Sequence, residues 1–116
     1  MMLRGEVRLV NLEPARGSEA NKKRPAVIVS NDRANATAAR LGRGVVTVVL
    51  VTSSTARLYP FQVLLDSEVT GLRMDSKAQA EQVRSVAVER IGPVIARLPA
   101  PTMNALDDAL RLHLQL

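Results

Sequence analysis

Apolar and polar residues alternate along much of this chain in the pattern of β-strands. From Leu3 to Leu12 apolar residues alternate with charged ones, which predicts a half-buried strand. Ala26–Ser30 is a second, central strand, and Pro25 is expected at its first position because proline donates no hydrogen bond to a strand ladder. Val45–Thr52 is almost continuously β-branched, which predicts a strand buried on both faces. Further strands are expected over Tyr59–Leu65 and Gln79–Val88.

Two helices are expected beside these strands. The first covers Arg33–Leu41, capped by Asn31 or Asp32 and broken by the glycines at 42 and 44. The second follows Leu98–Pro101, with Thr102 as its N-cap. Its apolar residues fall on one helical face: Met103, Leu106, Leu110 and Leu114. The remaining segments are a loop over Glu13–Lys23, a polar turn over Ser53–Leu58, and a loop over Asp66–Lys77 that includes one short strand.

These elements predict one domain over residues 1–116, mainly β with small α content. Its bent antiparallel strands are joined by a short helix and closed by a C-terminal helix. A small barrel is the arrangement that best hides the edges of so few strands. The length of 116 residues suits one compact core and excludes a two-domain enzyme with a large cofactor fold.

The composition excludes several classes of enzyme. The chain has no cysteine, which excludes disulfides, Fe–S clusters, thiolate zinc sites and cysteine nucleophiles. The single histidine, His113, falls in the last turn of the expected helix as a solvated or dipole-paired residue, so a Ser-His-Asp triad is excluded. Gly42-Arg43-Gly44 lacks the third glycine and the lysine of a phosphate-binding loop and is interpreted as a tight turn. The carboxylates lack metal-ligand spacing, so no metal and no cofactor are expected.

Charge indicates the class of partner and the compartment. With 16 Lys and Arg against 11 Asp and Glu, the net charge of +5 favours a polyanionic partner. The uncharged stretch Gly44–Ala56 is shorter than the roughly 20 apolar residues that cross a bilayer. Charged residues close to Met1 leave no room for a signal peptide. We therefore expect a soluble cytoplasmic protein with no membrane partner.

Two polar clusters are candidates for chemistry. Arg16, Lys22, Lys23 and Arg24 lie close together beside Gly17 and Ser18, either as a solvated loop or as a basic arm that follows a phosphate backbone. Thr52-Ser53-Ser54-Thr55 ends the buried strand, and these hydroxyls are either turn formers or groups presented by a rigid scaffold.

These clusters belong to a longer pattern that resembles the MazF/PemK (Kid) family of toxins from toxin–antitoxin modules. The resemblance begins with Gly17-Ser18-Glu19 and continues through the run from Arg24-Pro25 to Asn31-Asp32. Val51-Thr52-Ser53, Tyr59–Val63, Glu81–Ser85 and the closing helix follow in the same order and spacing, so the resemblance covers essentially the whole chain.

The resemblance implies an SH3-like, CcdB/PemK-type barrel that forms a homodimer. It also implies a metal-independent endoribonuclease that cuts single-stranded RNA at short sequences, inhibiting translation and growth until a cognate acidic antitoxin neutralises it. The family pattern places the catalytic arginine at Arg24 and the catalytic threonine at Thr52, with Ser53 adjacent. The chain departs from the Kid-like branch by having Glu81 where that branch has Asp, and Gln79 where it has Arg.

The chemistry of RNA fits these residue types independently. RNA is cut without metal when its own 2′-OH attacks the neighbouring phosphorus, provided that protons are transferred and the extra negative charge is stabilised. Arg24 is assigned to charge stabilisation because a guanidinium matches phosphate oxygens and stays protonated, with proton transfer by Arg24 as the alternative. Thr52 would hydrogen-bond the scissile phosphate. Glu81 is a candidate base or, alternatively, a carboxylate paired with a nearby arginine.

RNA binding would use other residues of the same face, because single strands are bound by stacking and by contacts to base edges. Tyr59 and Phe61 lie on one side of their strand, either in the core or stacked on bases. The RNA-binding candidates are Arg16, Ser18, Asn21, Lys22, Lys23, Tyr59, Gln79 and Gln82. Two rival functions remain, a CcdB-like gyrase poison and a non-catalytic RNA-binding barrel.

Overall fold

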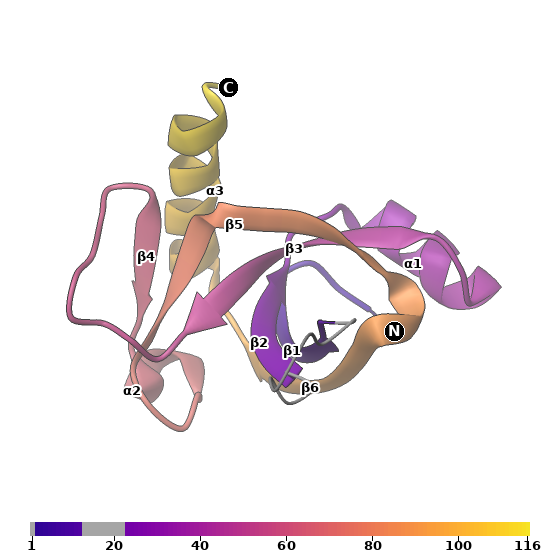
Figure 1. The fold of residues 1–116 in the computed structure, drawn as a ribbon, viewed down its shortest axis with the longest axis horizontal. Coiled ribbons are helices and arrows are strands. Elements are labelled where there is room, and N and C mark those ends of the chain that lie inside the picture. Colours follow the sequence, from indigo (N-terminus) through magenta and orange to yellow (C-terminus); the bar gives the residue numbers. More distant parts are fainter. Residues whose placement is uncertain (1, 13–22) are drawn as a thin grey trace, which may run out of the picture.

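The computed structural model describes residues 2–12 and 23–116, and within them the predicted fold class is confirmed. Six strands form one antiparallel sheet in the order β4-β5-β3-β2-β1-β6 (Figure 1). The strands are β1 (Glu6–Asn11), β2 (Lys23–Ile28), β3 (Val45–Thr52), β4 (Gln62–Leu65), β5 (Ser76–Ala87) and β6 (Ile91–Arg97). The helices are α1 (Asp32–Leu41), α2 (Ser67–Thr70) and α3 (Ala100–Leu114), and a 3-10 turn, η1 (Val88–Arg90), joins β5 to β6.

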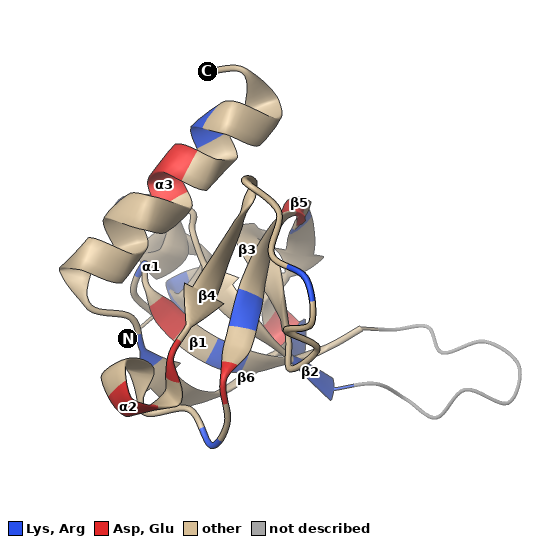
Figure 2. Cartoon of the chain, turned by 90° about the vertical axis from the view of Figure 1, so that its left-hand side faces the viewer, with Lys and Arg blue, Asp and Glu red and all other residues tan. Residues whose placement is uncertain are grey.

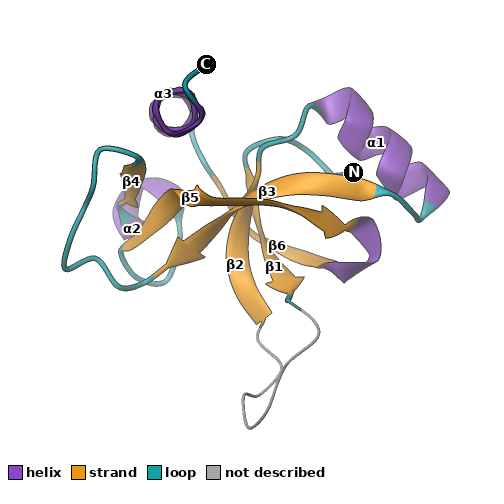
Figure 3. Ribbon diagram, turned by 45° about the horizontal axis from the view of Figure 1, so that its top comes forward, coloured by secondary structure: helices purple, strands orange, loops and turns teal. Residues whose placement is uncertain are grey.

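The sheet bends so strongly that its halves face different ways. β1, β2, β6 and the second half of β5 curl around the N-terminal segment, whereas β4 and the start of β5 lie beside α3 (Figures 1 and 3). The β3–β5 register shifts between Val49, which pairs with Val83, and Leu50, which pairs with Gln79. This bulge places Ala80–Gln82 outside the regular ladder, and bulges increase the local twist of a sheet.

Both faces of the central strands are buried, as predicted for Val45–Thr52. One cluster of apolar residues lies inside the curl and takes Val46, Val48 and Leu50 from β3. A second lies against α3 and takes Val49 and Val51 from the same strand, together with Met103 and Leu106 of the helix. Alternate β3 residues thus serve opposite clusters, which explains why the run is almost wholly apolar.

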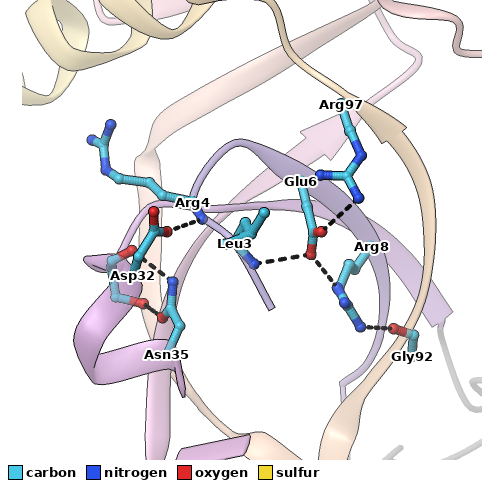
Figure 4. Close-up of polar contacts among 9 residues, drawn as sticks. Leu3, Arg4, Glu6, Arg8, Asp32, Asn35, Gly92 and Arg97 are labelled. Atoms are coloured by element: carbon cyan, nitrogen blue, oxygen red, sulfur yellow. Dashed lines mark hydrogen bonds and ion pairs between the residues drawn. The ribbon is translucent and has the colours of Figure 1, made fainter. Parts of the chain in front are cut away.

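A buried carboxylate joins β1 to β6 (Figure 4). The side chain of Glu6 is 1% exposed and accepts from Arg8 Nε at 2.9 Å and from the Leu3 N–H at 3.1 Å. Arg97 Nη2 of β6 lies 3.2 Å from its second oxygen, and Arg8 Nη1 donates to the Gly92 carbonyl at 3.0 Å. A buried charge needs such partners, so this cluster fixes the edge strand β6 to the sheet.

The Ser30-Asn31-Asp32 part of the family pattern serves structure in this chain. Asn31 caps α1 by accepting from the Ala34 N–H at 2.8 Å, which confirms the first of the two predicted caps. Buried Asn35 donates to the Ser30 carbonyl at 2.8 Å, and Asp32 accepts from the Arg4 N–H at 2.7 Å (Figure 4). These bonds tie the start of α1 to the end of β2 and to the N-terminal segment.

Four strand predictions were wrong in their bounds. β1 runs over Glu6–Asn11 rather than Leu3–Leu12, and β2 runs over Lys23–Ile28 rather than Ala26–Ser30. Pro25 is therefore the third residue of β2, because β2 pairs with β1 from Lys23 onward, and proline is tolerated there because the ladder to β3 begins only at Ala26. β4 begins at Gln62 rather than Tyr59, and β5 runs from Ser76 to Ala87 rather than from Gln79 to Val88. β6 was not predicted at all, because Gly92 and Pro93 read as strand breakers.

The helical predictions also need correction. Asp66–Lys77, expected as a loop with one short strand, contains the short helix α2 and the first two residues of β5. The helix was missed although Asp66 caps it by accepting from the Glu68 N–H at 2.8 Å. α3 begins two residues before the predicted cap Thr102, since Pro101 is tolerated in a first turn whose N–H groups need no helical partner. Leu114 extends past the sheet and is 48% exposed, so the buried stripe consists of Met103, Leu106 and Ala109.

Candidate active site

A cleft of about 670 Å³ opens where the β2–β3 ladder stops. Arg24 of β2 lines it together with Thr52 at the end of β3 and Ser53 just beyond. Arg73, Met74 and Ile95 also line the cleft. Figure 2 shows basic residues on β2 and on the loops near α2 and β4, at the end of the molecule away from the C-terminus. Three of the four predicted catalytic residues therefore meet in one cleft.

Two acceptors hold the guanidinium of Arg24. Its Nη2 donates to the Val51 carbonyl of β3 at 3.2 Å and lies at 3.5 Å from Gln79 Oε1 of β5. Gln79, predicted to contact RNA, therefore lies at the long end of hydrogen-bond distance from the predicted catalytic group. The side chain of Arg24 is half-buried, and none of its other N–H groups has a partner among the described residues. These free donors are available to an anionic ligand.

The proline after Arg24 explains why the Val51 carbonyl is free to accept. Val29 donates its N–H to the Thr47 carbonyl, so alternate residues of β2 face β3 with hydrogen-bonding groups. Counting in the register Ala26↔Leu50, Pro25 falls opposite Val51 at such a position. Proline has no N–H to give, and the guanidinium of the preceding residue supplies the donor instead. The proline of the Arg-Pro step thus leaves the Val51 carbonyl free to accept from the side chain of Arg24.

The hydroxyls at the end of β3 lie at the mouth of the cleft. Thr52 is half-buried, and its Oγ1 accepts from the Ser54 N–H at 3.2 Å, which leaves its O–H able to donate outward. Ser53 is exposed. A hydroxyl donor beside a guanidinium suits the oxygens of a phosphate.

Glu81 lies apart from this cleft, on the bulge of β5. Its Oε2 accepts from Gln62 Nε2 at 2.7 Å, and Gln62 Oε1 accepts from the Tyr59 N–H at 3.2 Å. Its Oε1 is buried and has no hydrogen-bond partner among the described residues. Of the two interpretations of Glu81, pairing with an arginine is wrong within residues 2–12 and 23–116, because its partner there is an amide. The base role stays a prediction.

Tyr59 is held on more than one side. Its ring stacks on Phe61 with centroids 5.5 Å apart and an interplanar angle of 3°, and Lys77 Nζ lies 6.0 Å from its centroid. His113 tilts against Phe61 at 6.2 Å, so the only histidine contacts a ring at the exposed end of α3. The Tyr59 side chain is 43% exposed, which leaves base stacking there as a prediction.

Two basic residues near the cleft were missed by the sequence analysis. Lys77 pairs with Thr52 in the β3–β5 ladder, is 7% exposed, and donates to the Arg57 carbonyl at 2.7 Å. Arg73 lines the cleft from the connection between α2 and β5. Both fall in the segment expected as a loop. Had the strand been predicted to begin at Ser76, as β5 does, Lys77 would have been recognised as a strand residue.

The other predicted RNA-binding residues divide into two groups. Lys23 and Gln82 are exposed on β2 and β5. Arg16, Ser18, Asn21 and Lys22 lie outside the described residues. Within residues 2–12 and 23–116 no cluster of three or more His, Asp or Glu could hold a metal ion. In the same part of the chain, no helix is long and apolar enough to cross a membrane.

Known proteins resemble this chain in sequence and in fold. Residues 3–114 match the family model described as PemK-like, MazF-like toxin of type II toxin–antitoxin system. The chain is 65% identical over 116 residues to endoribonuclease MazF9 of Mycobacterium tuberculosis, covering 100% of this chain and 98% of that protein. It is 30% identical over 113 residues to endoribonuclease EndoA of Bacillus subtilis, covering 97% and 94%. Among solved structures, a MazE–MazF structure from Deinococcus radiodurans superposes with a TM-score of 0.78 at 25% identity, covering 99% of this chain and 96% of that one. The chain therefore belongs to the PemK/MazF family of toxins of type II toxin–antitoxin systems.

Proposed function

We propose that this protein is a toxin endoribonuclease that cleaves single-stranded RNA by attack of the RNA's own 2′-OH, without a metal ion or cofactor. The observation that carries the proposal is the meeting of Arg24 and Thr52 in one cleft, with the guanidinium oriented by the Val51 carbonyl. Relatives that span the chain are named endoribonucleases, which supports the same activity.

Each catalytic residue has one task in this reaction. The 2′-oxygen forms a bond to phosphorus as the bond to the 5′-oxygen breaks, giving a 2′,3′-cyclic phosphate and a 5′-OH. The free N–H groups of Arg24 stabilise the charge that builds on the non-bridging oxygens, and the Thr52 hydroxyl donates to the same phosphate. Glu81 is the candidate acceptor of the 2′-OH proton, provided that substrate binding brings its carboxylate beside the ribose of the phosphate held by Arg24 and Thr52. The leaving 5′-oxygen then takes a proton from solvent.

The proposed partners follow from charge and from the family. A cognate acidic antitoxin would neutralise the net charge of +5 and occlude the cleft. Two similar solved structures, a mycobacterial endoribonuclease and the Deinococcus MazF, contain an antitoxin, which supports this partner. We further propose that the toxin is a homodimer and acts in the cytoplasm, where its RNA substrates occur.

The test is cleavage of a mixed-sequence single-stranded RNA in excess EDTA, with Arg24→Ala as the inactive variant and Arg43→Ala as its control. Arg43 lies in the turn before β3, so its loss removes the same charge at the opposite end of that strand, about 20 Å from Thr52. We expect fragments with 5′-OH ends from the wild type and Arg43→Ala and none from Arg24→Ala. RNA left intact by the wild type would contradict the proposal and favour gyrase inhibition. Binding of RNA without cleavage would favour the non-catalytic barrel.

A further inference from the structure

One wall of the cleft is apolar and lies open. Leu72 and Met74, from the connection between α2 and β5, line the cleft together with Ile95 of β6. Met74 is 58% exposed and Ile95 is 39% exposed. Apolar side chains grouped in a cleft beside polar ones are typical of a ligand site, because covering them with a flat apolar group releases water.

A free cation lies on this wall between two of its apolar residues. Arg73 is exposed, and its side chain forms no ion pair or hydrogen bond with any described residue. The side chains that line the cleft include two arginines, Arg24 and Arg73, and no carboxylate among the described residues. The charge of the cleft therefore suits a ligand that carries more than one phosphate.

The connection that forms the wall is anchored at both ends. Gly71 closes α2 with a φ of +84°, which favours glycine, and its N–H donates to the Ser67 carbonyl. Asp75 accepts a hydrogen bond from the Ser67 N–H at 2.8 Å. This bond, together with a hydrogen bond from the Ser67 side chain, holds the pKa of the Asp75 carboxyl below its ordinary value. Ser76 donates to the Met74 carbonyl at 3.1 Å. The wall is thus formed before a ligand arrives, which lowers the entropy cost of binding.

We infer that the Leu72–Met74 connection and Ile95 form the binding site for the nucleobase next to the scissile phosphate, and that Arg73 binds a phosphate adjoining that base. This inference rests on the proposed function, because the scissile phosphate is placed by Arg24 and Thr52 in the same cleft. A base offers a flat apolar face to Ile95 and a π-system to the Met74 thioether, a favourable contact for sulfur. The volume of about 670 Å³ falls in the range of sites for small ligands.

Substitutions of Met74 and of Arg73 should affect RNA cleavage in different ways. Met74→Ala should lower kcat/KM about tenfold on the preferred sequence and change which base is favoured at the cut, because a base site discriminates by apolar fit. Arg73→Ala should weaken binding about fivefold on every sequence and reduce the salt slope of log K by about 0.7, the value for one lost phosphate contact on a single strand. Arg73→Lys should restore much of that slope.

The experiment measures cut-site sequences on a mixed RNA, and salt-dependent binding of an oligonucleotide with deoxyribose at the cleaved position. Matched controls are Arg43→Ala for charge and Leu41→Ala for exposed apolar surface, since Leu41 is 52% exposed at the end of α1. If the wild type cuts RNA while the Met74 and Arg73 variants match their controls, the inference is overturned and the proposed function stands. RNA left intact by the wild type overturns the proposed function with it. Weakened binding of an acidic peptide with unchanged RNA binding would assign the wall to a protein partner and overturn the inference.

Discussion

Replacing Pro25 with alanine tests how Arg24 is held. The alanine N–H would face the Val51 carbonyl at a hydrogen-bonding position of the ladder and compete with Arg24 Nη2, which now donates to that oxygen at 3.2 Å. The guanidinium would then keep only the long 3.5 Å contact to Gln79. Pro25→Ala should therefore impair catalysis without touching a catalytic side chain.

The magnitude follows from the bonds exchanged. A hydrogen bond from a charged donor contributes about 1.5 kcal/mol at a half-buried site, and losing that orientation in the transition state costs about tenfold in kcat. Folding stability should hardly change. The new ladder bond adds about 1 kcal/mol, whereas removing proline frees the unfolded chain and costs about as much.

The assay is single-turnover cleavage of RNA in EDTA, paired with thermal unfolding. Pro93→Ala is the matched control, because Pro93 is an exposed proline within the edge strand β6. The double variant with Arg24→Ala should be no worse than Arg24→Ala alone, since Pro25 acts through Arg24. Wild-type kcat in Pro25→Ala, with an unchanged melting temperature, would refute the claim that the Val51 carbonyl positions the guanidinium.

Three further predictions concern the frame of the site. Glu6→Gln leaves Arg8 and Arg97 facing a neutral group and should lower the free energy of unfolding by about 3 kcal/mol in urea titrations; a loss under about 1 kcal/mol would contradict the role of this cluster. Gly92→Ala places a Cβ 2.8 Å from the Leu9 carbonyl oxygen and should cost about 2 kcal/mol by the same measurement; an unchanged free energy of unfolding would contradict the need for close approach at this position. The lowered pKa of Asp75 means that its anchor is present above the ordinary value of 3.8 and is lost as the pH falls below it. The protection factor of the Ser67 amide, its exchange rate relative to that of an unfolded amide at the same pH, should fall in that acidic range in the wild type, and Asp75→Asn should remove this change in protection.

The sequence predicted the centre of the sheet better than its edge. Val45–Thr52 was found with its bounds because both faces of β3 are buried along most of its length and its residues are almost all β-branched. β6 was missed because it contains a glycine and a proline, and the contacts that require the glycine exist only in the folded sheet. Gly92 accepts from Arg8 and lies against the Leu9 carbonyl, so a residue that reads as a breaker is required there by close approach.

Some residues of the site could likewise be predicted from the sequence, and others could not. Arg24 and Thr52 were predicted together through the family pattern, and the β2–β3 pairing brings them into one cleft. The position of Glu81 was not predictable, because it depends on a register shift between β3 and β5 that leaves no mark in the hydrophobic pattern. Arg73 and Met74 were missed for a related reason, since the turn at Gly71 alone aims their connection at the cleft.

The positions of Arg24 and Glu81 bear on which of them handles protons. Arg24 uses one nitrogen to bind Val51 and Gln79 and keeps its remaining donors for a ligand, which suits a group that stabilises charge and holds its protons. Glu81 has one oxygen engaged by Gln62 and a second, buried oxygen with no partner among the described residues, so it has a lone pair for a proton but must become exposed to reach the 2′-OH. If Glu81 accepts the 2′-OH proton, Glu81→Gln should lower kcat in single-turnover cleavage while RNA binding stays unchanged. Gln62→Ala, which removes the amide that engages the first oxygen, should lower kcat less than Glu81→Gln, and equal losses in both variants would assign Glu81 a structural role instead.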